Sequence, residues 1–161
     1  MMRNDFRGLR MKEYKIFYIE LLKTALLFVW QLPQNIIGFF ITRFSVYRFT
    51  ETINKRKINI WCNGNFFNSA VSLGHYIIID YISCLTGISE NTIRHERGHQ
   101  IQSERLGWLY LPLVGLPSIA RNIWDRIFHR KWDSRRRSVW YYSGYPERQA
   151  DRLGNVCRKR L

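Results

Sequence analysis

The sequence predicts a mainly helical α+β fold in which a small sheet lies beside one central helix. Three observations predict this class: an uncharged apolar run in the N-terminal third, a stretch over about residues 57–80 that alternates like β-strands, and a capped helix over about residues 89–106. With 161 residues, of which 46% are hydrophobic, the chain is long enough to form one packed domain, residues 1–161.

The N-terminal third predicts two apolar helices within about residues 11–45. Residues 24–42 are uncharged, a run of 19 that is long enough to cross a bilayer. Polar residues and Pro33 lie at its centre, however, where desolvated polar groups cost most. We therefore expect a helix to about Trp30, a break at Gln31–Gln34 and a second short helix packed on the core. A kinked hairpin that dips into a membrane is the alternative.

The following segment predicts a small sheet. Lys57–Trp61 alternates as a half-buried strand, and Asn63-Gly64 is a turn signal. Val71–Ile79 is expected to form a second strand that ends at Asp80.

The central helix carries the most informative motif of the chain. Ser89 is a candidate N-cap and Gly107 a natural stop. Between them, residues 95–99 read His-Glu-Arg-Gly-His, the HExxH pattern, which shuffling would produce in roughly 0.004 of sequences of this composition. On a helix both histidines share one face, so both imidazoles can bind one Zn²⁺ while Glu96 lies beside the open position. Gly98 suggests the close approach of a neighbouring backbone.

Two histidines leave zinc one protein ligand short, so a third is expected downstream. The candidates are Glu104, Asp125, His129, Asp133, Glu147, Asp151 and Cys157. Glu104 points away from the histidine face of its helix. Glu147 follows Pro146 and is four residues before Asp151, on a helix predicted over about residues 146–153. One of these carboxylates can bind the metal while the other accepts a hydrogen bond from a ligating histidine.

HExxH followed by ExxxD resembles the gluzincin metallopeptidases, over the part of the chain from His95 to Asp151. The size of the chain resembles the minimal, single-domain members of that family. The resemblance implies a zincin-like fold, one Zn²⁺ per chain, and hydrolysis of peptide substrates. It also implies an edge strand that pairs with extended substrate, for which Tyr76–Ile79 is the best candidate. The implied roles are zinc ligation by His95, His99 and Glu147, general base catalysis by Glu96, and orientation of a ligand by Asp151.

The expected reaction is amide hydrolysis by a zinc-bound water from which Glu96 takes the proton. Such sites often add a donor for the oxyanion. Four residues in the approach to the Glu147 helix could supply it, and the sequence leaves them open: His129, Tyr141, Tyr142 and Tyr145. Tyr142 and Tyr145 join Glu96 as expected catalytic residues.

The net charge of +14 is concentrated near the C-terminus. Seven basic residues lie in Arg121–Arg137, partly on a basic helix predicted over about residues 117–131, and the tail carries Arg158-Lys159-Arg160. Such a surface attracts anionic lipid, nucleic acid or acidic polypeptide. A non-enzymatic basic module is therefore an alternative function. The aromatic residues that flank the arginine run are either stacking platforms or core or interfacial residues: Trp132, Trp140, Tyr141 and Tyr142.

The uncharged segment Leu106–Ala120 is expected to cover the core or to form one wall of the cleft, with membrane contact as the rival interpretation. Cys62, Cys84 and Cys157 form neither a CxxC pair nor an even set, which argues against a disulfide framework and favours a reducing compartment. A secretory signal is not expected, because Glu13 and Glu20 precede the apolar run and no small-residue cleavage site stands out within the usual length. A cytoplasmic protein is expected, with a membrane-associated or membrane-embedded metalloprotease as the alternative.

Overall fold

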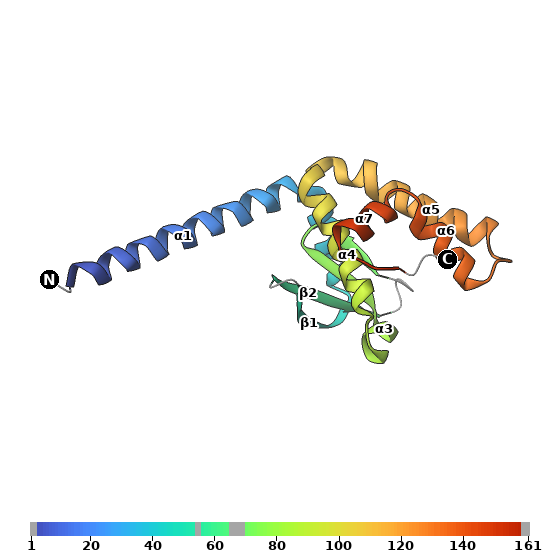
Figure 1. Ribbon diagram of the computed structural model, residues 1–161, viewed down its shortest axis with the longest axis horizontal. Coiled ribbons are helices and arrows are strands. Elements are labelled where there is room, and N and C mark those ends of the chain that lie inside the picture. Colours follow the sequence, from blue (N-terminus) through green and yellow to red (C-terminus); the bar gives the residue numbers. More distant parts are fainter. Residues whose placement is uncertain (1–2, 54–55, 65–69, 159–161) are drawn as a thin grey trace.

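The computed structural model describes residues 3–53, 56–64 and 70–158, with side chains from residue 14 onward outside residues 53–57 (Figure 1). The fold is α+β and mainly helical with a small mixed sheet, as the sequence predicts. The basic tail residues 159 and 160 lie outside the described part.

The two N-terminal helices are α1 (Arg3–Trp30) and α2 (Leu32–Thr42). Pro33 lies in the first turn of α2, where its missing N–H is tolerated, so the predicted break at this point is confirmed. The predicted end near residue 45 is too late, because a strand already begins at Ser45. Figure 1 shows α1 extending away from the rest of the molecule.

Among the described helices, none is by itself long and apolar enough to span a membrane. Helices α1 and α2 reach that length and hydropathy only as a pair, from Tyr14 to Thr42, and they meet at an angle of 88°.

Within the described residues, four strands form one mixed sheet: β1 (Ser45–Ile53), β2 (Arg56–Asn63), β3 (Val71–Leu73) and β4 (Tyr76–Asp80). Their order is β1-β2-β4-β3, with β2 and β4 parallel and the other pairs antiparallel. Two predictions are wrong here. The expected single strand Val71–Ile79 is a hairpin that turns at Gly74, where φ is +60°. Strand β4 pairs on both sides, so the edge beside it is β3 and not Tyr76–Ile79.

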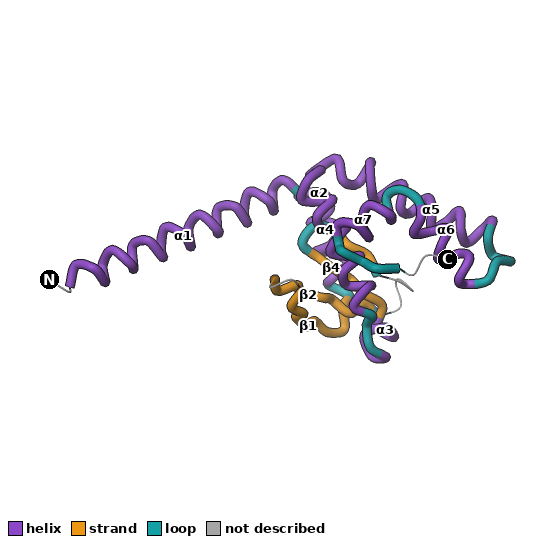
Figure 2. The backbone as a smooth tube through the Cα atoms, viewed as in Figure 1, coloured by secondary structure: helices purple, strands orange, loops and turns teal. Residues whose placement is uncertain are grey.

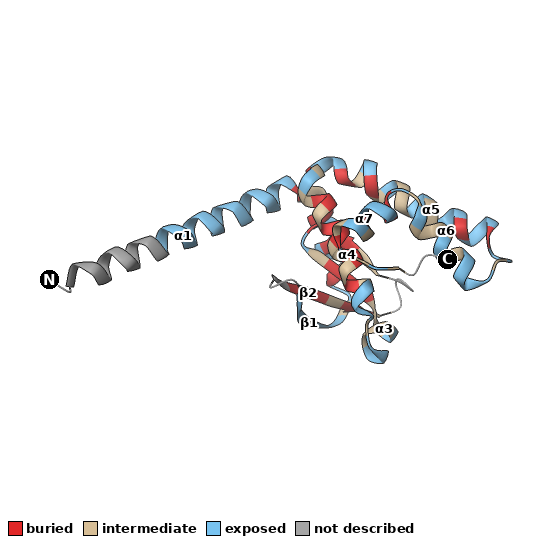
Figure 3. Ribbon diagram, viewed as in Figure 1, coloured by how far each residue is buried: buried red, intermediate tan, exposed pale blue. Residues whose placement is uncertain are grey.

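The core lies between the sheet and α4 (Glu90–Leu106). Ile58 and Ile60 of β2 alternate inward, as predicted, and pack with Ile77, Ile79 and Ile93. Figure 2 shows α4 directly beside the strands, and Figure 3 shows buried residues concentrated along it. The sheet therefore supports the face of α4 opposite its exposed residues.

The cysteine prediction is corrected by the structure. Cys62 on β2 forms a disulfide with Cys84 on α3 (Tyr81–Thr86), and their Cα atoms are 6.3 Å apart. The 22-residue separation gives no sign of this pairing, because packing of α3 on the sheet brings the two together. The pairing removes the argument for a reducing compartment.

The C-terminal half is helical: η1 (Gly107–Leu109), η2 (Leu111–Gly115), α5 (Leu116–Phe128), α6 (Ser134–Ser143) and α7 (Glu147–Leu153). Helix α6 was not predicted; Asp133 caps it by accepting a hydrogen bond from the Arg136 N–H at 2.9 Å. The close approach predicted at Gly98 is confirmed, because a Cβ there would lie 1.9 Å from the carbonyl oxygen of Ala150 on α7.

Candidate metal centre

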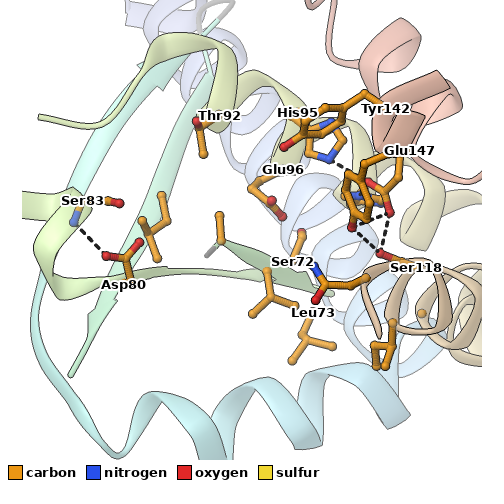
Figure 4. A pocket seen from close by; sticks show the side chains of 18 of the residues that line it. Ser72, Leu73, Asp80, Ser83, Thr92, His95, Glu96, Ser118, Tyr142 and Glu147 are labelled. Atoms are coloured by element: carbon orange, nitrogen blue, oxygen red, sulfur yellow. Dashed lines mark hydrogen bonds and ion pairs between the residues drawn. The ribbon is translucent and has the colours of Figure 1, made fainter. Parts of the chain in front are cut away.

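The three predicted zinc ligands converge between α4 and α7. His95 Nε2 lies 3.0 Å from Glu147 Oε2, and His99 Nε2 lies 3.2 Å from the same oxygen. All three side chains are buried, and their ligand atoms lie within 4.8 Å of one another. Figure 4 shows His95 and Glu147 facing each other at one end of a pocket. This group could hold a metal ion.

Second hydrogen bonds fix both imidazole rings. His95 Nδ1 lies 2.7 Å from Asp151 Oδ1, and His99 Nδ1 lies 2.7 Å from Gln102 Oε1. The Gln102 amide is oriented because its Nε2 donates to Gln149 Oε1 at 2.8 Å. Both Nδ1 atoms therefore face acceptors and carry protons, so each ring directs an Nε2 lone pair at Glu147 when it is neutral and donates to Glu147 when it is protonated.

This arrangement fits a divalent metal such as zinc. Two nitrogen lone pairs and a carboxylate oxygen repel one another at these distances unless a positive charge lies among them. Tetrahedral zinc with bonds of ~2.1 Å separates its ligand atoms by ~3.4 Å, slightly more than the two N···O distances of 3.0 and 3.2 Å. Two imidazoles and a carboxylate, with one position open, are a donor set of catalytic zinc sites.

In the metal-free protein, a proton can supply that charge. Burial lowers the pKa of His95, but hydrogen bonds to Asp151 and Glu147 outweigh burial and raise this pKa to about 9. Burial likewise raises the pKa of Glu147, yet hydrogen bonds from His95 and His99 outweigh it and hold the pKa well below its usual range. Glu147 is therefore an anionic ligand, and His95 must lose a proton to bind a metal.

The other oxygen of Glu147 is held by two hydroxyl groups. Ser118 of α5 donates to Glu147 Oε1 at 2.5 Å, and Tyr141 of α6 donates to it at 3.1 Å. Helices α5 and α6 thus fix the carboxylate that α7 carries, so that Oε2 points to the histidines. Tyr141 acts here through Glu147, which makes it a positioning residue rather than a free donor.

Glu96 is buried in the same pocket, and its Oε2 has no hydrogen-bond partner among the described residues. Figure 4 shows the carboxylate directed into the cavity. Burial is the main cause that raises the pKa of Glu96. An unpaired, buried carboxylate of raised pKa is suited to accept and return a proton.

The pocket is a cleft of ≈ 960 Å³. Edge strand β3 lines it through Val71, Ser72 and Leu73, and the segment Leu106–Ala120 contributes to one wall, as predicted. Tyr110 of that segment is buried and donates to the Ser72 carbonyl oxygen at 3.0 Å. The cleft is large enough for a peptide segment.

Of the four oxyanion candidates, Tyr142 fits best. It lines the cleft, and its ring centroid lies 5.1 Å from that of His95. Tyr145 does not line the cleft; its side chain is exposed, and its hydroxyl donates to the Leu113 carbonyl oxygen at 2.7 Å. The prediction of Tyr145 as a catalytic residue is therefore wrong, because Tyr145 lies after the end of α6 and its hydroxyl binds a carbonyl oxygen outside the cleft. The ring of His129 stacks on the ring of Trp132 with their centroids 3.9 Å apart, away from the metal ligands.

Three residues of the site were missed. Gln102 lies three residues after His99, a spacing that could have revealed it. Ser118 and Arg158 had no local signal. Arg158 Nε donates to Asp151 Oδ2 at 2.7 Å, and its guanidinium lies 3.3 Å from the Tyr142 ring centroid, so it joins the second carboxylate to the tyrosine.

Two arginines of the basic segment make contacts within the protein. Arg137 Nη2 lies 2.7 Å from Asp125 Oδ2, and the Arg121 guanidinium lies 4.1 Å from the Trp140 ring centroid. The ring of Trp132 stacks on His129. Both tryptophans are half-buried, and part of each ring surface is occupied by a contact within the molecule.

Compared with known proteins, the chain matches no family model, no curated protein and no solved structure.

Proposed function

We propose that this protein is a zinc-dependent metallopeptidase of gluzincin type, with a zincin-like fold. One observation carries the proposal: the Nε2 atoms of His95 and His99 and one oxygen of Glu147 converge in the cleft that also holds the unpaired carboxylate of Glu96. A buried general base beside three ligands of this kind is suited to hydrolysis of an amide.

The residues divide the expected reaction among them. A zinc ion held by the three ligands would polarise the scissile carbonyl and make a bound water more acidic. Glu96 accepts a proton from the attacking water and returns it to the leaving amine. Tyr142 donates a hydrogen bond to the developing oxyanion. Asp151 and Gln102 keep the two imidazoles in the tautomer that leaves Nε2 free.

Zinc content tests the proposal first. We expect about one zinc per chain in the wild type by elemental analysis, and loss of zinc in His99→Ala and Glu147→Ala. Glu104→Ala is the matched control, because Glu104 is on the same helix as the histidines but pairs with Arg97 at 2.7 Å. A wild type that takes up no zinc after reconstitution would refute the metallopeptidase.

Zinc uptake should also release a proton. The His95 pKa of about 9 means that His95 carries a proton at pH 7, and this proton must leave before Nε2 can bind a metal. Zinc affinity should therefore rise with pH up to about 9, and calorimetry at pH 7 in buffers of different ionisation enthalpy should detect release of about one proton. Asp151→Asn removes an anionic hydrogen-bond partner of His95, so zinc affinity should level off at a lower pH than in the wild type. The same pH dependence in both proteins would contradict the role of Asp151 in raising the His95 pKa.

The role of Tyr142 is tested by Tyr142→Phe. Loss of an oxyanion donor should lower kcat about 100-fold with little change in KM or in zinc content. Tyr145→Phe is the control, since that hydroxyl binds the Leu113 carbonyl oxygen outside the cleft. If both variants keep full kcat, the oxyanion donor lies elsewhere.

A further inference from the structure

Helix α5 is inverted relative to a helix on the surface of a water-soluble domain. Its outward face carries Leu116, Ile119, Ile123 and Ile127, which recur every three or four residues and are each more than half exposed. Its inward face carries Ser118, Arg121 and Asp125, which hydrogen-bond to Glu147, to backbone carbonyl oxygens of α6 and to Arg137. In water the apolar face of an amphipathic helix is the one that packs inward.

Helix α2 shows the same inversion. Gln34 and Asn35 are fully buried, where Gln34 Nε2 donates to Ser103 Oγ at 2.9 Å and Asn35 Oδ1 accepts from the His75 N–H at 2.9 Å. The outward residues are Ile36, Ile37, Phe39 and Phe40, all exposed. Two helices that hydrogen-bond inward and present apolar side chains outward match the arrangement of proteins in contact with lipid.

The two inverted faces border one opening. Ile37 of α2 and Leu116 and Ile119 of α5 line the cleft as well as being exposed. The mouth of the cleft therefore lies between two apolar surfaces, and a medium that covers both surfaces also meets the cleft.

Helix α1 distinguishes a bilayer from a protein partner. Its consecutive residues 16–19 are all apolar or aromatic and more than half exposed, and at 100° per residue they cover the whole circumference of the helix. A protein partner that packs on one side leaves the other side in water, whereas lipid surrounds a helix. Figure 3 shows exposed residues along the described part of α1.

Charge identifies the kind of lipid. The chain carries a net charge of +14, and five basic residues at the end of α5 and just beyond it are exposed: Arg126, Arg130, Lys131, Arg135 and Arg136. Basic residues next to an exposed apolar face attract anionic headgroups while the apolar side chains enter the acyl boundary.

We propose that the outward faces of α2 and α5 dock on a bilayer that contains anionic phospholipid, with the mouth of the cleft at the lipid surface. Docking does not depend on the proposed zinc chemistry, because none of the outward residues on which it rests is a metal ligand.

The test measures quenching of Trp124 by brominated phosphatidylcholine in vesicles that also contain phosphatidylserine, with the full chain. Trp124 lies on α5 and is 52% exposed. Its signal is the difference between the wild type and Trp124→Phe. We expect this signal to be quenched, and quenching to fall about tenfold in the double variant Ile123→Asp/Ile127→Asp, whose positions do not line the cleft. Vesicles without phosphatidylserine should quench more weakly.

Ile82→Asp/Leu85→Asp is the matched control, because these residues of α3 are as exposed as those of α5 and should leave the quenching unchanged. The proposal is overturned if Trp124 of the wild type is not quenched, if the α5 and α3 variants behave alike, or if phosphatidylserine makes no difference. It is also overturned if the wild type forms a discrete oligomer that the α5 variant dissociates, which would make this face a protein interface. If the α5 variant fails to fold, the difference in quenching between the wild type and Trp124→Phe still tests whether Trp124 meets lipid.

Discussion

Replacing Glu96 by glutamine should lower kcat for peptide hydrolysis by about 1000-fold while zinc remains bound. The carboxylate lies in the cleft without a hydrogen-bond partner among the described residues, so an amide of the same shape fits but cannot accept a proton. The substitution also removes a buried group whose pKa is raised by burial, so folding should be preserved. Steady-state kinetics beside elemental analysis of the same sample measures both effects.

Two controls make this result specific. Glu104→Gln changes a glutamate on the same helix that pairs with Arg97, and it should keep both zinc and activity. The wild type stripped of zinc by a chelator should lose activity and regain it when zinc is restored. Retention of full activity by Glu96→Gln would remove the general base from the mechanism and leave the metal group with another role.

Gly98→Ala should destabilise the protein by about 3 kcal/mol and weaken zinc binding. A Cβ at this position would lie 1.9 Å from the Ala150 carbonyl oxygen and 2.6 Å from its carbonyl carbon, so α7 would have to move. The intrinsic preference of a helix for alanine, about 1 kcal/mol, does not compensate for a clash with backbone. Because Glu147 and Asp151 flank Ala150, a displaced α7 carries both carboxylates away from the histidines.

Thermal unfolding and zinc content measure this prediction. For a chain of this size the midpoint should fall by about 9 °C. Gly115→Ala is the matched control, because its Cβ would meet only ordinary contacts at 3.5 Å and its φ of −59° suits alanine. A Gly98→Ala protein with an unchanged midpoint and full zinc content would show that α4 and α7 do not depend on this close approach.

Several local features were predictable because they follow from the spacing of residues along one helix. The capping residues and HExxH placed His95 and His99 on one face of α4, and the four-residue spacing of Glu147 and Asp151 placed both on α7. The break before α2 followed from Pro33. In each case the atoms concerned are within a turn of one another, so periodicity and propensity decide the outcome.

Predictions failed where the outcome depended on segments that are distant in sequence. The interior place of β4 depends on its pairing with β2. The Cys62 and Cys84 pair depends on how α3 packs on the sheet. Tyr142 and Tyr145 are only three residues apart, yet only Tyr142 lines the cleft, so the sequence could not separate them.

By itself the sequence determined the donor chemistry. It places two histidines one turn apart on one helix, with a glutamate next to the first, and two carboxylates one turn apart on another helix. Only the tertiary structure decided that His95 Nε2, His99 Nε2 and Glu147 Oε2 meet, that Ser118 orients Glu147, and that α2 and α5 hold their apolar faces outward. The physical reason is that the spacing of residues along a helix fixes which side chains share its face, whereas the direction of that face is set by the elements that pack against it.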